Sequence, residues 1–153
     1  MLIAEVARAL VEAGVRFGVA GGFAVALHGA VRGTIDLDLV LALDRENYEA
    51  AEAALLSLGF VARLPVQAHE IFDNRRDYID QRNLVAWSFV DPRDPSRLVD
   101  IIITWEEPHV PTVDKMLTGE AIPVLSKDRL IEMKRRSGRP QDWADIRALE
   151  RLP

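Results

Sequence analysis

The sequence contains no cysteine, so it can form no disulfide, no thiolate metal site and no cysteine nucleophile. It also lacks an excess of positive charge. Its 19 Lys and Arg residues stand against 24 Asp and Glu residues, a formal net charge of −5. A protein that holds nucleic acid by bulk charge would be basic. The composition therefore excludes a simple clamp on a phosphate backbone, although it is compatible with a local basic patch.

Long hydrophobic runs are absent as well. The longest apolar stretch, residues 98–104, contains Asp100 and is far shorter than a membrane span. The N-terminal stretch carries Glu5 and Arg8 within an amphipathic pattern, which predicts a helix and not a signal peptide. Of the 153 residues, 49% are hydrophobic, enough for the core of one domain. We expect a single cytoplasmic domain over residues 1–153, with no membrane partner.

Apolar residues at helical spacing predict five helices. Gly14, Gly59 and Gly138 are expected to end three of them, and Ser126 is expected to cap the N-terminus of the helix that Gly138 ends. The predicted helices cover residues 2–13, 23–28, 46–58, 127–136 and 140–149.

Short apolar segments predict strands between these helices. They lie at residues 15–20, 34–43, 60–64, 84–90 and 97–104. Residues 91–96 (DPRDPS) predict a longer loop that joins the last two strands as a hairpin, and residues 70–80 are compatible with a short helix or a loop. The pattern predicts an α/β (α+β) fold with a mixed β-sheet flanked by helices. Its core is expected over residues 15–104, with a C-terminal part, 112–150, that is helical apart from a short strand near 121–124.

The segment from Ala20 to Leu41 (AGGFAVALHGAVRGTIDLDLVL) holds the strongest chemical signal. A strand ends at Gly21-Gly22, and a helix starts there. The first N–H groups of a helix have no internal partners, and glycine lets a phosphate approach the main chain closely. Gly21 and Gly22 are therefore candidates for phosphate contact, although two glycines after a strand are equally compatible with a plain tight turn.

Asp36 and Asp38 follow on the next predicted strand. Residues two apart on a strand point to the same face, so these carboxylates repel each other unless a cation lies between them. Leu37, Leu39 and Leu41 point the other way, toward a core. Magnesium prefers carboxylates together with substrate phosphates. The alternative is two solvent-exposed aspartates where the strand begins.

Asp100 lies inside the apolar segment RLVDIII, where a free carboxylate would be costly to bury. A strand beside Asp36 and Asp38 would bring Asp100 to the same face. Three convergent carboxylates can hold two divalent ions for in-line phosphoryl displacement. The alternative is a surface aspartate on an edge strand, but the flanking residues leave little sign of a polar face.

Together these residues resemble the nucleotidyltransferase superfamily of DNA polymerase beta. The motif is a strand, a Gly-Gly turn into a helix, D-x-D on the next strand and a third Asp further on. The variant GGFAVALHG…R-x-T-x-D-x-D resembles small stand-alone bacterial members, which are related to nucleotidyltransferase modules of abortive-infection and toxin–antitoxin systems. The resemblance covers roughly residues 15–104 and is less specific for the substrate than for the superfamily.

The resemblance implies roles for individual residues. Asp36 and Asp38 would bind both magnesium (or manganese) ions, and Asp100 would bind the catalytic ion and help to activate the acceptor hydroxyl. Gly21 and Gly22 would contact the phosphates. The reaction it implies is attack of a hydroxyl of RNA, protein or a small molecule on the α-phosphate of a nucleoside triphosphate, with release of pyrophosphate.

Further residues support this interpretation less directly. Arg32 and Thr34 precede the D-x-D, where they could reach the phosphates, although Arg32 could instead pair with Asp36. His28 could contact the nucleotide or hydrogen-bond within the loop, and we favour the second interpretation. The tryptophans are expected to pack in the core or an interface. They are Trp87, Trp105 and Trp143.

The C-terminal segment DRLIEMKRRSGRPQDWADIRAL also resembles small members of this group, which often carry a Lys followed by R-x-x-D-x-x-D. Lys134 would turn inward to hold the triphosphate or offset the carboxylates, or else be solvated at a basic helix end. Asp142 and Asp145 are expected to pair with nearby arginines such as Arg139.

Two features leave the acceptor open. Residues 67–82 are densely charged and could select the acceptor at the rim of the cleft or form a solvated loop. No separate RNA-binding domain is apparent, so a large nucleic acid would need a partner protein from a neighbouring gene, or a homodimer. A different class of function is therefore also compatible with the sequence: a catalytically weak antitoxin, regulatory subunit or nucleotide-binding module that acts through a protein partner.

Overall fold

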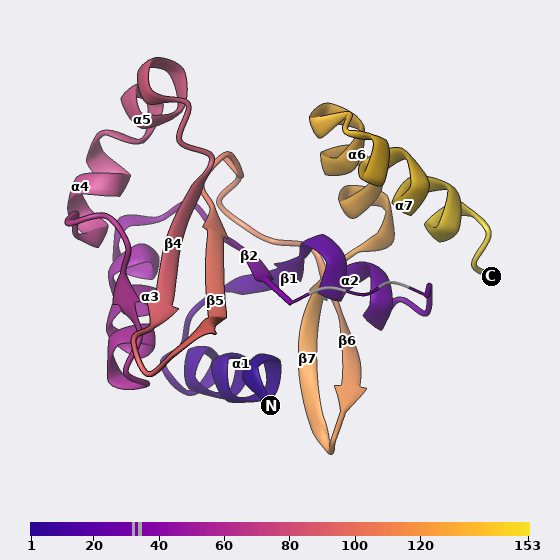
Figure 1. Cartoon of the computed structure of the whole chain (residues 1–153), viewed down its shortest axis with the longest axis horizontal. Helices are drawn as coiled ribbons and strands as arrows, with labels where there is room; N and C mark the ends of the chain where they lie inside the picture. Colours follow the sequence, from indigo (N-terminus) through magenta and orange to yellow (C-terminus); the bar gives the residue numbers. More distant parts are fainter. Residues whose placement is uncertain (32, 34) are drawn as a thin grey trace.

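The computed structural model of the chain describes residues 1–31, 33 and 35–153. Within these residues seven strands form one mixed sheet in the order β3-β4-β5-β2-β1-β7-β6 (Figure 1). Neighbours are parallel in the β2–β5 and β1–β7 pairs and antiparallel elsewhere. The strands are β1 (Phe17–Ala20), β2 (Leu37–Leu41), β3 (Val61–Ala62), β4 (Ala86–Asp91), β5 (Asp94–Ile102), β6 (Thr112–Leu117) and β7 (Glu120–Leu125).

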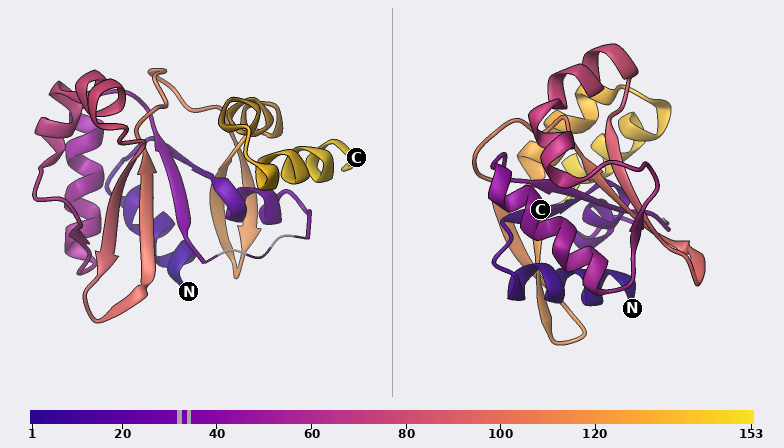
Figure 2. Two further views of the ribbon diagram at one scale, coloured as in Figure 1. Left: turned by 45° about the horizontal axis from the view of Figure 1, so that its top comes forward. Right: turned by 90° about the vertical axis from the view of Figure 1, so that its left-hand side faces the viewer.

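The described residues also form seven helices, none of them long and apolar enough to cross a bilayer. Figures 1 and 2 show α3, α4 and α5 beside β4 at one side of the molecule, and α6 and α7 at the other. The helices are α1 (Leu2–Glu12), α2 (Gly21–Leu27), α3 (Arg45–Ser57), α4 (Ala68–Asp73), α5 (Arg75–Arg82), α6 (Lys127–Ser137) and α7 (Pro140–Glu150). The predicted mixed sheet flanked by helices is therefore confirmed.

One face of the central strands is apolar and covered by helices. On β4, Trp87 is fully buried and stacks on Tyr48 of α3, with ring centroids 6.1 Å apart. Leu37 and Leu39 of β2 are at most 1% exposed. Because side chains alternate along a strand, burial of this set turns the residues between them to the opposite face.

Residues 112–117 correct the expectation of a helical C-terminal part. They form β6, which pairs antiparallel with β7 and lies at the edge of the sheet. Thr118 and Gly119 connect the two strands with positive φ angles of 49° and 82°. Two left-handed residues suit the right-handed twist of a two-residue hairpin. The helical expectation was wrong because an edge strand whose side chains are mostly exposed lacks a clear period-two pattern.

Further details concern the ends of elements, the connections between them and one cap. The helix after β1 starts at Gly21, not Phe23, and the predicted 91–96 loop is only Pro92-Arg93, because Asp91 already pairs with Asp94. The ambiguous stretch 70–80 lies within two helices, α4 and α5. Ser126 occupies the N-cap position of α6, but its side chain makes no capping hydrogen bond.

Candidate active site

One row of residues crosses four strands and brings two of the predicted aspartates side by side. Asp100 of β5 is the direct partner of Asp38 on β2 and of Ser88 on β4, and Asp38 is the partner of Ala20 on β1. Directly paired residues of neighbouring strands share a face of the sheet. Asp38 and Asp100 therefore share the face opposite to the helix-covered Trp87.

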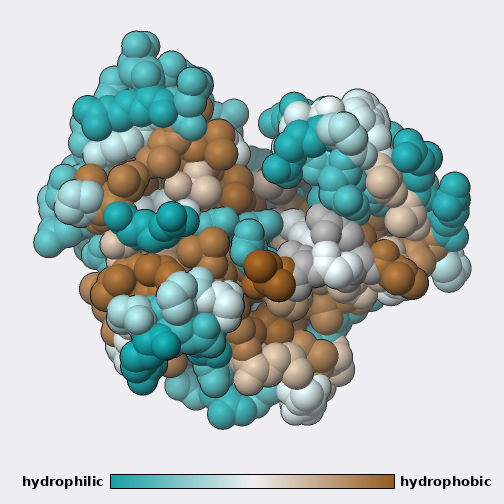
Figure 3. All heavy atoms as spheres, viewed as in Figure 1, coloured by the Kyte–Doolittle hydropathy of each residue, from teal (hydrophilic) through white to brown (hydrophobic). Residues whose placement is uncertain are grey.

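A pocket of about 750 Å³ opens over this row. Asp36, Asp38 and Asp100 line its floor with Gly21, and residues of α6 and the start of α7 line the opposite wall. Figure 3 shows the surface hollowed between the hydrophilic ends of α5 and α6. The three predicted carboxylates thus face one solvent-accessible space.

The electrostatics of the pocket centre on Asp38. Burial, reinforced by the neighbouring charges of Asp100 and Asp36, raises the Asp38 pKa from 3.8 to about 6. The positive charges of Lys134 and Arg139 act in the opposite direction but do not cancel this rise. Crowded carboxylates in a partly buried place favour a bound cation, because a cation would relieve both the burial cost and the repulsion.

The donor set fits a hard divalent cation. Carboxylate oxygens are the ligands that Mg²⁺ prefers, usually one or two of them completed by water and substrate phosphates. Among the described residues no three acidic or histidine side chains close around a point that could hold an ion. Asp36, Asp38 and Asp100 would therefore offer an open site, which a substrate could complete.

Gly21 lets the chain turn closely over Asp38. Its φ is +63°, a region that L-residues avoid, and a Cβ there would lie 2.8 Å from Asp38 Cγ and overlap the Oδ2 oxygen. The glycine therefore serves a close approach of backbone and carboxylate. Gly22, in contrast, is buried and does not appear among the described residues that line the pocket.

Lys134 turns inward, as its helical phase predicted, and is 6% exposed. Its Nζ lies 2.8 Å from Asp145 Oδ2 and 3.7 Å from Asp142 Oδ1, so the ion pairs tie α6 to α7. Arg139 donates to Asp142 Oδ2 over 2.9 Å. The expected arginine partner is therefore confirmed for Asp142, and Asp145 pairs with Lys134, a partner that the sequence did not assign to it.

Other predicted residues have structural partners or fall outside the description. The His28 Nε2 atom lies 2.8 Å from the carbonyl oxygen of Leu125, so His28 links α2 to the end of β7 instead of bonding within its own loop. Arg32 and Thr34 lie outside the described residues. Trp87 and Trp105 are buried, as expected, while Trp143 is 44% exposed.

Sequence reasoning missed two sets of contacts made by residues that line the pocket. Ser88 donates to Asp100 Oδ1 over 2.6 Å, and only the register of β4 against β5 reveals that neighbour. Arg129 on α6 lies over the Trp105 ring, 4.8 Å from its centroid, and pairs with Glu107. No sequence motif marks either contact, because the residues that meet lie far apart in the chain.

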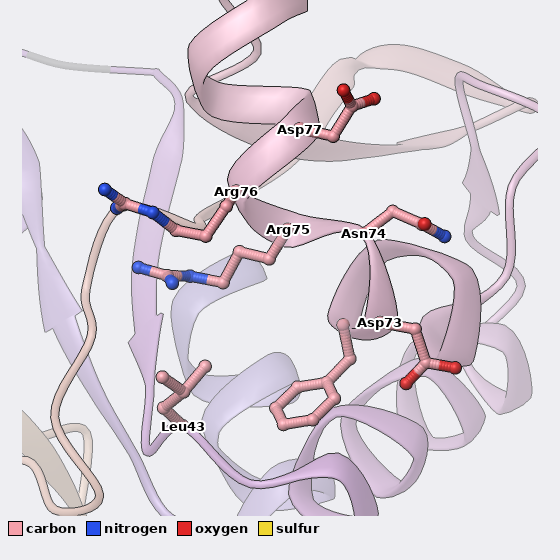
Figure 4. Close-up of a pocket in the computed structure, with 7 residues that line it drawn as sticks. Leu43, Asp73, Asn74, Arg75, Arg76 and Asp77 are labelled. Atoms are coloured by element: carbon pink, nitrogen blue, oxygen red, sulfur yellow. The ribbon is translucent and has the colours of Figure 1, made fainter.

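The charged stretch 67–82 lies beside the pocket. None of its residues is among the described residues that line the pocket. At the start of α5, Arg75 and Arg76 extend the same way, next to a smaller pocket of about 270 Å³, while Asp77 points away (Figure 4). Arg75 is buried and donates to the carbonyl oxygens of Ile103 and Thr104. It thereby holds the segment that follows β5, the strand that carries Asp100.

Comparison with known proteins gives one family and several structural neighbours. The model of the aminoglycoside-2''-adenylyltransferase family matches residues 2–149. Among curated proteins, none matches the chain.

The solved structures agree in fold. The antibiotic-resistance factor ANT(2'')-Ia superposes with a TM-score of 0.63 at 16% identity, over 97% of this chain and 80% of that one. TM1012 of Thermotoga maritima, a putative nucleotidyltransferase, gives 0.61 at 18% identity over 94% and 87%. The lincosamide antibiotic adenylyltransferase LnuA gives 0.58 at 15% identity over 94% and 90%. At these identities the likeness concerns the fold.

Proposed function

Because the chain belongs to the aminoglycoside-2''-adenylyltransferase family, we propose that it moves a nucleoside monophosphate, AMP first of all, from a nucleoside triphosphate to a hydroxyl group of a small polar molecule. The resemblance to the nucleotidyltransferase superfamily is confirmed by this membership. The closer relation to abortive-infection and toxin–antitoxin modules stays a prediction.

A single observation carries the proposed chemistry. Asp38 and Asp100 are direct partners on parallel strands, on the open face of the sheet, and Asp36 lines the same pocket. Buried like charges are costly unless an opposite charge compensates them. The divalent cations that accompany a triphosphate would supply that positive charge.

The proposed reaction would use these groups as follows. The acceptor oxygen forms a bond to the α-phosphorus, the bond from that phosphorus to the bridging oxygen breaks, and pyrophosphate leaves with the electron pair. In this proposal Asp100 would take the hydroxyl proton. Cations held by Asp36, Asp38 and Asp100 would neutralise the charge that develops on the phosphate oxygens.

Groups on the opposite wall suit the departing phosphates. Lys134 and Arg139 line the pocket, and the charge of each reaches Asp38. Helix α2 begins at Gly21, which also lines the pocket, so the first N–H groups of the helix lie near the pocket. The carboxylate floor and the cationic wall together match a metal-bound triphosphate.

The lining of the pocket supports a small polar acceptor over RNA. Apart from the three aspartates assigned to the cations, its described residues include four carboxylates and four cationic side chains, so no positive excess remains to attract a nucleic-acid backbone. The amino groups of a sugar would find carboxylates to pair with there. The family description names an aminoglycoside acceptor, and we extend that class to this chain.

The test is transfer of label from α-³²P-ATP in the presence of Mg²⁺ or Mn²⁺. The acceptors are tobramycin, lincomycin, total RNA and a protein extract, each in a separate reaction. We expect labelled small-molecule product and its loss in Asp38→Asn and Asp100→Asn. Asp114→Asn, an exposed carboxylate on edge strand β6, is the matched control and should keep wild-type activity.

The other outcomes separate the alternatives. Label on RNA or protein alone would refute the small-molecule acceptor and retain the reaction. Melting-temperature shifts with ATP and metal, but no transfer to any acceptor, would favour a nucleotide-binding module. If none of the four nucleoside triphosphates shifts the melting temperature with either metal, the proposed function fails, and an antitoxin or regulatory subunit with a protein partner becomes the better interpretation.

A further inference from the structure

We propose that Ser88 is a positioning residue for Asp100: its hydroxyl fixes one carboxylate oxygen and leaves the other to face the pocket. The inference rests on the proposed function, because it concerns the carboxylate that would receive the acceptor proton. No motif in the sequence marks Ser88, and it becomes visible only in the pairing of β4 with β5.

The contact itself is short and direct. Ser88 Oγ donates to Asp100 Oδ1 over 2.6 Å, and the two residues are opposite each other in the antiparallel ladder. Hydrogen bonds to an ionised carboxylate are shorter and stronger than neutral ones. The bond therefore restricts rotation of the Asp100 side chain, because a turned carboxylate would lose it.

The hydroxyl is held in place by the strand around it. Trp87 and Phe89, the neighbours of Ser88 in the chain, are fully buried on the opposite face. The Ser88 carbonyl accepts a hydrogen bond from the Arg63 N–H over 2.9 Å. A donor anchored on both sides in this way supports a functional group more accurately than one on a mobile loop.

Ser88 acts from behind the site. It is not among the described residues that line the pocket, whereas Asp100 is. The row across the sheet runs Ser88, Asp100, Asp38, so the serine and the second carboxylate lie on opposite sides of Asp100. Ser88 thus holds Asp100 on the side away from Asp38, and its effect on the reaction passes through Asp100.

The kinetic test compares Ser88→Ala with Ser88→Thr in the α-³²P-ATP transfer assay. We expect kcat of the alanine variant to fall about 10- to 100-fold, the loss typical of a hydrogen bond to a charged group, with KM for ATP within about twofold of wild type. Threonine keeps the hydroxyl and suits a strand, so it should restore kcat to within about threefold.

Ser96→Ala is the matched control, since Ser96 Oγ also donates to an aspartate on β5, Asp94 Oδ1, over 2.6 Å, but at the exposed end of the strand. Its kcat should be unchanged. Melting temperatures of all variants identify any loss of folding. Unchanged kcat in a folded Ser88→Ala, or a threonine variant as slow as the alanine variant, would overturn the positioning role.

A second readout needs neither metal nor nucleotide. Three-bond Hα–Hβ couplings measured by NMR should show one Asp100 rotamer in wild type and in Ser88→Thr, and averaged rotamers in Ser88→Ala. If wild type transfers no label but the couplings change as expected, the proposed function fails and the positioning role stands. If Asp100 keeps one rotamer without the serine hydroxyl, the inference fails whatever the activity.

Discussion

Replacement of Gly21 by alanine should displace the Asp38 carboxylate of the candidate site. The new Cβ would lie 2.8 Å from Asp38 Cγ and overlap Oδ2, whereas Cβ contacts below 3.0 Å are essentially never seen. To restore an ordinary 3.4 Å contact with the new Cβ, Asp38 Cγ must move by about 0.6 Å. Its Oδ2 atom must move further, so the carboxylate shifts on the order of 1 Å. A misplacement of that size can cost about 100-fold in rate.

A second glycine provides the control for backbone strain. Gly14 has φ +72°, close to the +63° of Gly21, but a Cβ there would meet nothing within 4 Å. Both alanine variants therefore lose about 1–2 kcal/mol of stability from the left-handed backbone, a shift of roughly 2–8 °C in Tm. Only Gly21→Ala also displaces the Asp38 carboxylate.

The assay is label transfer from α-³²P-ATP alongside thermal unfolding. We expect Gly14→Ala to keep wild-type transfer and Gly21→Ala to lose about 100-fold in kcat/KM. A folded Gly21→Ala with wild-type transfer would refute the close packing of this glycine against a functional carboxylate. Equal activity losses in both variants would attribute the effect to stability alone.

Three further predictions concern charge. Asp38→Asn should raise the Tm of metal-free protein at pH 7 while abolishing transfer, because a carboxyl with its pKa raised to about 6 is destabilised in its ionised form; an unchanged or lower Tm would contradict this. Lys134→Met should cost about 3–5 kcal/mol in urea unfolding, since it removes the buried cation that lies between Asp142 and Asp145, whereas Arg135→Met, at an exposed site on the same helix, should cost little. Burial raises the pKa of Asp142, but hydrogen bonds from Arg139 and nearby positive charge outweigh it and hold the pKa below 3.8. The resulting stability is complete above the unfolded value and lost as the pH falls through the folded one, so urea unfolding should show a smaller loss below pH 4 in Asp142→Asn than in wild type.

Much of the local structure was predictable from the sequence. The apolar period marked α1 and α3, and the glycines after them ended both helices near the predicted positions. The alternation of D-x-D with leucines predicted that Asp36 and Asp38 face away from the core, because the side-chain period of a strand is two. Both line the pocket, although Asp36 lies just before β2. Edge strand β6 was missed, since its residues are mostly exposed and its stability comes from pairing with β7.

What the sequence by itself determined, then, is the set of carboxylates, the Gly-Gly turn and the helix that carries Lys134, since each depends on neighbours within a few residues. The tertiary structure decided which of them meet. It placed Asp100 beside Asp38 across the parallel β2–β5 pair, Ser88 behind Asp100, and Asp145 against Lys134. These contacts depend on strand order, register and helix packing, which join residues far apart in the chain and leave no periodic trace in the sequence.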